Sequence, residues 1–213
     1  MKKILLILFI LCSVHAYSQT ISYGISGGPN FTNFPGNGTL NLSPSNDYIT
    51  GFHVGGLLDI KFQSFSLQPG ILFTTTGGEG KVYFYNGSNG VTDYVINKIV
   101  LDYIEVPINF LYRIKTDNGS VFLGGGPYFS FGVSGKISYA INKDYGTTDN
   151  LSFGNDSSDI NVLDFGVNTL EGYQFDSGFV ISGGYGFGLT NVYHSGPDNK
   201  NKGFTVSIGY FFK

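Results

Sequence analysis

Hydrophobic and polar side chains alternate along eight separate segments of the chain between Ile21 and Lys213. In the last of them, Phe204, Val206 and Ile208 share one parity, while small and polar residues occupy the other. A period of two is typical of a β-strand with one apolar and one polar face. The predicted strands span about 20–33, 49–62, 65–76, 98–114, 120–135, 160–175, 178–190 and the terminal segment from Phe204 to Phe212.

The connections between these strands run alternately long and short along the chain. Short turns are expected near Gln63, Asp117 and Asp176, and long connections at about 34–48, 77–97, 136–159 and 191–202. Each strand is long enough to cross the hydrocarbon layer when tilted, and unpaired backbone is not tolerated in lipid. The sequence therefore predicts an all-β fold, an eight-stranded antiparallel up-and-down transmembrane β-barrel. The second long connection alternates as well, so its two flanking strands are expected to extend as a hairpin above the membrane.

Composition supports strands rather than helices. The chain holds 32 Gly, 20 Phe and 15 Tyr, and shows no sustained helical period in its mature part. Tyr23, Tyr112, Tyr173, Tyr193 and Tyr210 are candidates for the aromatic girdles at the membrane interfaces. Four prolines fall inside predicted strands, where each would remove a ladder hydrogen bond, so bulges or strand ends are expected there. These are Pro29, Pro69, Pro107 and Pro127.

The N-terminal segment, residues 1–18, has the features of a signal peptide. A basic start precedes an apolar run too short to span a bilayer, and Ala16 and Ser18 supply a cleavage site of small residues. The barrel domain then covers residues 19–213, exported to the cell outer membrane of a Gram-negative bacterium. Cys12 is lost with the signal, so the mature chain has no thiol chemistry. Without Lys2 and Lys3 it holds ten basic and fifteen acidic residues, which makes nucleic acid an unsuitable partner.

The polar parity of the strands collects charged and hydrogen-bonding residues that would face the barrel interior. An eight-stranded barrel is wide enough only for side chains to fill it, and charges held there must pair. We expect Glu105 to pair with Lys61 or Arg113, and Asp59 or Asp164 to pair with the other base. The expected network comprises His53, Asp59, Lys61, Glu105, Asn109, Arg113 and Asp164, with Gln68, Tyr103, Tyr128 and Asn168 on the same parity. A polar core is the main interpretation; a proton or ion path and a catalytic acid–base pair are the alternatives.

No residue is assigned a catalytic, cofactor-binding or metal-binding role. His53 points inward, and His194 adjoins Ser195 in a loop, a spacing that rarely gives a catalytic triad. A zinc site needs three or four suitable side-chain ligands, and two histidines without cysteine do not supply them. Carboxylates of the third long connection do not follow the EF-hand spacing, so a solvated acidic loop is expected. They are Asp144, Asp149, Asp156 and Asp159.

Five blocks of the sequence resemble those of the PorT-like outer-membrane β-barrel family, in the family's order. Leu101–Tyr112 resembles its "YLEIPLLLKY" signature, and Gly126–Tyr128 its "GPY" strand. Asp164–Gly166, Tyr185–Asn191 and Gly27–Phe31 resemble its "DFG", "RYGLGLTNI" and "GGLNFS" blocks. The resemblance implies an eight-stranded outer-membrane barrel and no single established activity.

The chain departs from that pattern in two places. Gly184 stands where a basic residue often precedes the "YGLGLTNI" block. Thr169 and Glu171 interrupt an apolar parity, and a lipid-facing carboxylate is costly near the midplane. We expect Glu171 near the periplasmic rim, or behind a bulge that turns it inward.

The function expected from this pattern is a non-enzymatic outer-membrane barrel that presents four surface loops for binding or assembly in the cell envelope. Its expected partners are outer-membrane lipid, the barrel assembly machinery during insertion, and another envelope protein. A small-solute channel, an envelope lipid-modifying enzyme and a soluble ligand-binding barrel are the alternatives. The last requires an apolar interior, the inverse of the parity found here.

Overall fold

The computed structural model describes residues 20–34, 43–85, 92–141, 144–156, 159–194 and 199–212. The predicted signal peptide lies outside the described residues. Within them the chain forms strands and no helix, so no helix is long and apolar enough to cross a membrane.

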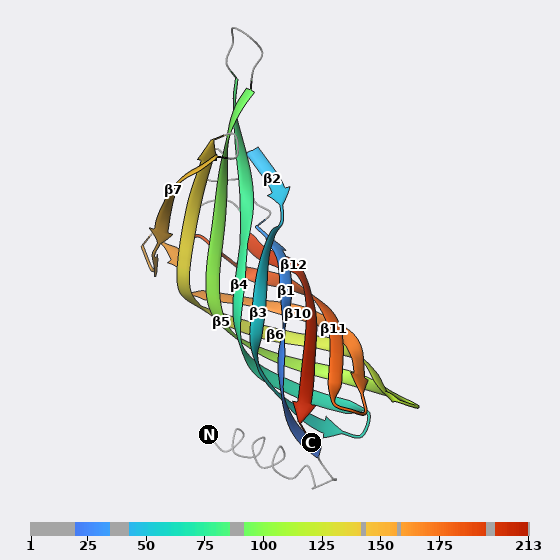
Figure 1. Ribbon diagram of the computed structural model, residues 1–213. Coiled ribbons are helices and arrows are strands. Elements are labelled where there is room, and N and C mark those ends of the chain that lie inside the picture. The colour runs from blue at the N-terminus through green and yellow to red at the C-terminus, as the bar shows by residue number, and fades with distance from the viewer. Residues whose placement is uncertain are drawn as a thin grey trace, which may run out of the picture.

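Eight antiparallel strands close into a barrel, which confirms the predicted fold class (Figure 1). The order around the wall is β10-β11-β12-β1-β3-β4-β5-β6, and pairing of β6 with β10 closes the ring. These strands span Thr20–Asn33 (β1), Ile49–Phe62 (β3), Phe65–Tyr85 (β4), Thr92–Thr116 (β5), Gly119–Ile141 (β6), Leu163–Phe175 (β10), Phe179–Asn191 (β11) and Lys200–Phe212 (β12). The tight turns β3–β4, β5–β6 and β10–β11 lie at one end with the start of β1 and the end of β12. We call it the turn end and the opposite one the loop end.

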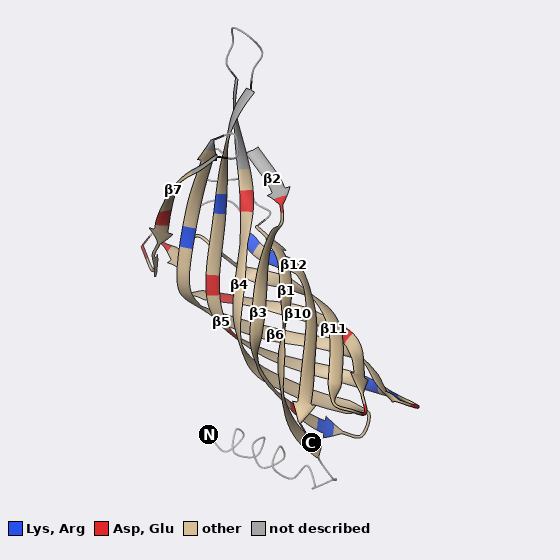
Figure 2. Cartoon of the chain, in the orientation of Figure 1, with Lys and Arg blue, Asp and Glu red and all other residues tan. Residues whose placement is uncertain are grey.

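The two faces of the wall have the predicted polarity. Large apolar side chains such as Phe52, Phe187 and Ile208 are about half exposed on the outside, while Asp59 and Arg113 are buried inside. Figure 2 shows a largely uncharged stretch of wall between charged positions at the two ends. An apolar outside around a charged inside is the reverse of the arrangement in a water-soluble protein. For the described residues it excludes the alternative of a soluble ligand-binding barrel.

Three strands are much longer than the rest. β4, β5 and β6 have 21, 25 and 23 residues, against 13 or 14 in the other strands of the barrel. Their additional parts stay paired beyond the barrel, and Figure 1 shows them projecting at the loop end. We call the projecting part the outer sheet: residues 75–85 of β4, 92–102 of β5 and 132–141 of β6, flanked by β2 (Ser43–Asp47) and β7 (Asp144–Leu151). The predicted extended hairpin is therefore confirmed.

Two short strands precede β10. One lies in the third long connection, where no strand was predicted, and the other is the start of the predicted strand 160–175, which the structure separates from β10. β8 (Phe153–Gly154) and β9 (Ile160–Asn161) pair in parallel, and Gly132 N donates to the carbonyl of Val162 at 2.8 Å. The segment after β7 thus folds back against the barrel mouth.

The prolines create neither bulges nor strand ends, so that prediction is wrong. Each proline pairs with one neighbouring strand and stands in a two-residue gap of the ladder on its other side. Pro107, for example, pairs with Tyr128 of β6, while the β4–β5 ladder breaks between Pro69 and Leu72 and resumes in the same register. A missing N–H interrupts one ladder only, because a strand residue directs its hydrogen bonds to one side.

Candidate functional site: a polar chamber between two apolar plugs

Charged side chains form a compact ionic cluster inside the turn end. Arg113 Nη2 donates to Asp59 Oδ2 at 2.8 Å, and Lys61 Nζ lies 3.5 Å from the same oxygen. Arg113 also donates to Ser66 Oγ at 2.9 Å and to Gln174 Oε1 at 2.8 Å. A buried ion pair is stable only when further hydrogen bonds satisfy both ions, and these partners satisfy the guanidinium.

An apolar layer, the inner plug, adjoins this cluster on the side facing the barrel centre. It consists of Leu111, Phe122, Val180 and Phe211, with Leu57 and Leu170 packed against them. The guanidinium of Arg113 lies 5.3 Å from the ring centre of Phe122, which joins the two layers by a cation–π contact.

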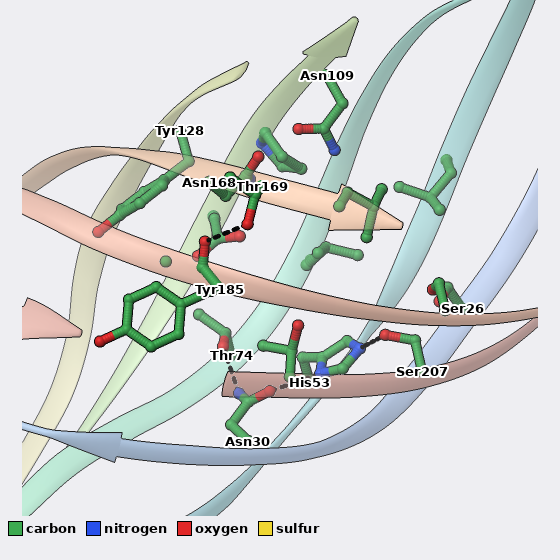
Figure 3. A pocket seen from close by; sticks show the side chains of 18 of the residues that line it. Ser26, Asn30, His53, Thr74, Asn109, Tyr128, Asn168, Thr169, Tyr185 and Ser207 are labelled. Atoms are coloured by element: carbon green, nitrogen blue, oxygen red, sulfur yellow. Dashed lines mark hydrogen bonds between the residues drawn. The ribbon is translucent and has the colours of Figure 1, made fainter. Parts of the chain in front are cut away.

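Beyond the inner plug lies a polar chamber of about 140 Å³. On one wall, His53 links β1, β3 and β12 (Figure 3): Nδ1 is 2.6 Å from Asn30 Oδ1 and Nε2 is 2.8 Å from Ser207 Oγ. Asn30 Nδ2 donates to Thr74 Oγ1 at 2.9 Å, so its Oδ1 faces the imidazole as an acceptor. Nδ1 of His53 therefore carries the hydrogen in this pair.

The opposite wall holds two carboxylates. Ser130 Oγ donates to Glu105 Oε2 at 3.3 Å, while Thr190 Oγ1 and Asn201 Nδ2 donate to Asp164 at 2.9 and 3.3 Å. Register brings the two acids together, because Ser130 pairs with Glu105 on β5 and with Asp164 on β10.

A second apolar layer, the outer plug, covers the chamber toward the loop end. Its buried members are Ile99, Leu101, Tyr103, Ile137, Ile160 and Val192, with Phe34, Tyr139, Leu151, Phe153 and Tyr193 packed against them. Phe153 meets the ring of Tyr103 edge-on at 5.8 Å and contacts Gly132, where a Cβ would collide with it. The outer plug thus covers the chamber toward the loop end, while at the inner plug the chamber reaches Arg113 and Gln174 of the ionic cluster.

The structure brings the seven predicted interior residues to two levels of the barrel rather than one. Asp59, Lys61 and Arg113 form the ionic cluster. His53, Glu105, Asn109 and Asp164 line the chamber, and Arg113 contributes to its lining as well. The expected ion pair of Glu105 with Lys61 or Arg113 is wrong. Of the two acids expected to pair with the other base, Asp59 does so and Asp164 does not: among the described residues both bases share Asp59. Glu105 lies eight residues before Arg113 on β5, a separation of about 26 Å along a strand.

Several chamber residues were not predicted, namely Asn30, Thr74, Ser130, Thr190, Asn201 and Ser207. They share the inward parity, which was a usable signal. Small polar residues are common on that parity in any barrel, so only the strand registers distinguish those that meet in the chamber.

Two further predictions need correction. Glu171 is exposed on the outer face, four residues before the end of β10, and β10 pairs with both neighbours without a register shift, so the alternative bulge is wrong. Tyr193 packs against the outer plug instead of joining an aromatic girdle. Tyr23, Tyr112 and Tyr210 do lie exposed at the turn end.

No group of three or more His, Cys, Asp or Glu side chains suited to a metal occurs among the described residues. Asp156 and Asp159 are linked to each other by a hydrogen bond between the Asp156 N–H and Asp159 Oδ2 at 3.3 Å. His194 Nε2 lies 2.8 Å from the carbonyl oxygen of Gly154, far along the chain from His53.

A family model described as "Outer membrane protein beta-barrel domain" matches residues 17–194, from before β1 to just past the end of β11. Among solved structures, the chain is similar to Ail, the attachment invasion locus protein of Yersinia pestis crystallised with a heparin analogue, at 14% identity over 90% of this chain and 99% of that chain, with a TM-score of 0.44. It is also similar to Neisserial surface protein A, at 12% identity over 92% and 100% of the two chains, with a TM-score of 0.45. No curated protein matches the chain.

Proposed function

Because the chain belongs to the family of the outer membrane protein beta-barrel domain, we propose that it is a non-enzymatic outer-membrane protein that binds an envelope partner through its outer sheet. The observation that carries the proposal is the length of β4, β5 and β6. About ten residues per strand beyond the barrel correspond to roughly 30 Å of continuous sheet. A barrel needs no such sheet to cross a bilayer.

The outer sheet has one face covered and one edge free for a partner. Its inner face packs against the β8–β9 segment within the outer plug. At its edge, β7 ends the hydrogen-bonded sheet path, and residues 146–150 are all exposed. An edge strand offers unpaired backbone groups to an added strand, a common mode of protein recognition.

Two variants test this proposal against the intact protein. The first replaces residues 83–94 with a two-residue turn, joining Val82 to its register partner Val95 and leaving the β5–β6 pairing in place. The second is Thr147→Pro, which disrupts the β7 edge. A partner that co-purifies with the wild type from gently solubilised outer membranes should be lost from at least one of them. A variant in the turn at Asp117 serves as the control at the opposite end of the barrel.

Retention of the same partner by both variants, each with normal heat-modifiable migration in gels, would overturn the proposal. The barrel assembly machinery and outer-membrane lipid are proposed as general partners of any such barrel. Loss of these would affect the control variant equally.

The sequence blocks described above support a narrower proposal, a place within the PorT-like branch of these barrels. The block from Leu101 to Tyr112 forms the central part of β5 and supplies two chamber residues, Glu105 and Asn109. Exchange of this block with the corresponding block of a PorT-like protein should preserve folding if the branch is correct. A misfolded exchange variant would count against it.

A second candidate function, an acyl hydrolase, is favoured by one observation. Asn30, His53 and Ser207 are joined by hydrogen bonds in the order of an Asn–His–Ser triad. Against it, all three are buried inside the barrel, and Ser207 lies within β12, opposite Ser182 of β11. A fluorophosphonate probe decides: labelling that disappears in Ser207→Ala supports a hydrolase, and an unlabelled wild type excludes this nucleophile.

The channel alternative conflicts with the outer plug. An open pore needs a continuous polar path, whereas this packed apolar layer covers the chamber toward the loop end. Planar bilayers containing the wild-type barrel should be electrically silent. Steady conductance would favour the channel.

A further inference from the structure

We propose that the polar chamber is a binding site for a hard divalent cation such as Ca²⁺, held between Glu105 and Asp164. The two acids face the chamber from strands β5 and β10, with Ser130 of β6 between them. Among the described residues their hydrogen-bond partners are neutral hydroxyl and amide groups, and neither acid forms an ion pair with a base.

Strand register brings the two carboxylates to the same level of the barrel, because both are paired with Ser130, one on each side of β6. Like charges facing each other in a low-dielectric interior repel strongly, and a cation between them removes that repulsion. Two bases also line the chamber without an ion pair to either acid: Arg113 is paired with Asp59, and Lys202 lies on the outward parity of β12.

Unpartnered oxygen atoms in the same chamber point to a ligand independently of the acids. The hydroxyl of Tyr103 and Oδ1 of Asn201 have no hydrogen-bond partner, although these residues are only 1% and 6% exposed. Oδ1 of Asn109 is unpartnered in the same way. A buried polar atom without a partner is costly, so these oxygens are positioned for a group that the chamber receives.

The chamber has space for an ion together with part of its water shell. β11 carries no side chain into it at Gly184 and Gly186, and a Cβ at Gly186 would meet no atom within 4 Å. The donors are carboxylate, amide and hydroxyl oxygens, the set that Ca²⁺ takes with six to eight ligands, waters included.

Terbium luminescence tests the site directly. Tb³⁺ replaces Ca²⁺ at oxygen sites and emits when a nearby aromatic ring is excited. The chain has no Trp, so any sensitised emission comes from tyrosine, and Tyr103 and Tyr128 both line the chamber. The full mature barrel is stripped with a chelator and refolded with Tb³⁺ present, so that access through the plugs does not limit binding.

Two variants probe the site by different routes. Glu105→Gln with Asp164→Asn removes both charges at constant shape, and Gly186→Leu fills the space while keeping both acids. The control, Asp156→Asn with Asp159→Asn, removes two carboxylates from the third long connection. We expect Ca²⁺-displaceable emission in the wild type and the control, and binding weakened about tenfold or more in the two chamber variants.

Three results would overturn the proposal. They are a folded wild type without Ca²⁺-displaceable emission, chamber variants that match the wild type, and loss of the emission in the control alone. Heat-modifiable migration reports folding for each variant. If the doubly substituted variant does not fold, Gly186→Leu still decides the outcome.

Discussion

Arg113 Nη2 and Asp59 Oδ2 lie 2.8 Å apart inside the turn end, and neither side chain is more than 7% exposed. Because both ions are removed from water, each depends on the other for compensation. The pair also fixes how β3 meets β5 across β4.

Asp59→Asn should destabilise the barrel by about 3 kcal/mol, because it leaves the Arg113 guanidinium buried without its counter-ion. Urea unfolding from lipid vesicles measures the loss. The paired replacement Asp59→Leu with Arg113→Met should unfold at a higher urea concentration than the single variant. Equal midpoints for Asp59→Asn and the wild type would contradict the role of this pair.

Membrane depth should control the effect of a charge on the outer face. Ile25 and Ile21 lie on the same face of β1 and are 58% and 60% exposed, but Ile21 is closer to the turn end. Ile25→Arg should cost about 2–4 kcal/mol and Ile21→Arg about 1 kcal/mol or less, because the penalty falls from midplane to interface. The same urea assay compares the two variants, and an equal cost at both positions would place the lipid band elsewhere.

The contact of Phe153 with Gly132 should hold the third long connection over the barrel mouth. Gly132→Val places side-chain atoms where the Phe153 ring lies, so it should displace that ring and the β8–β9 segment. We expect faster proteolysis within residues 142–162 with little change in barrel unfolding. Ser134→Val, at an exposed position nearby on β6, is the control, and similar cleavage rates in the two variants would exclude this contact as the restraint.

Tyr193 lies in the β11–β12 connection, beyond the wall strands, where burial, with a smaller contribution from Tyr139, raises the pKa of its hydroxyl to about 12. The folded state therefore binds this proton more tightly than the unfolded state does. Stability from the packed, neutral ring is complete below pH 10 and falls as the pH rises from 10 to 12. Tyr193→Phe should abolish that fall in the outer plug, measured by proteolysis across this range. An unchanged pH profile in the variant would assign the effect to another group.

The barrel could be predicted from the sequence because its signal repeats in every strand. Phe52, Val54 and Leu58 alternate with His53, Gly55 and Asp59, and the same opposition recurs around the wall. Turn residues fixed the strand boundaries, and β1 and β3 begin and end at the predicted residues. The two-residue alternation and the turn residues are local features, so a single sequence is enough to reveal them.

The partners inside the barrel could not be predicted in the same way. Parity shows that Glu105 and Arg113 both point inward, but they lie at different levels, and the shear of the barrel decides which strands meet at each level. Asn201 of β12 donates hydrogen bonds to Thr76 of β4 and Asp164 of β10. These contacts depend on how three strands are aligned with one another, which parity does not show. The strand β8, its pairing with β9 and the separation of β9 from β10 escaped prediction because two-residue strands carry no periodic pattern.

The outer sheet continues the barrel wall, since β4–β5 pairing runs unbroken from Leu72 opposite Glu105 to Tyr85 opposite Thr92. A pulling force on the tip would therefore load the strands lengthwise, in shear, so that many bonds would have to break together. The projection is therefore, in mechanical terms, a strut continuous with the barrel wall.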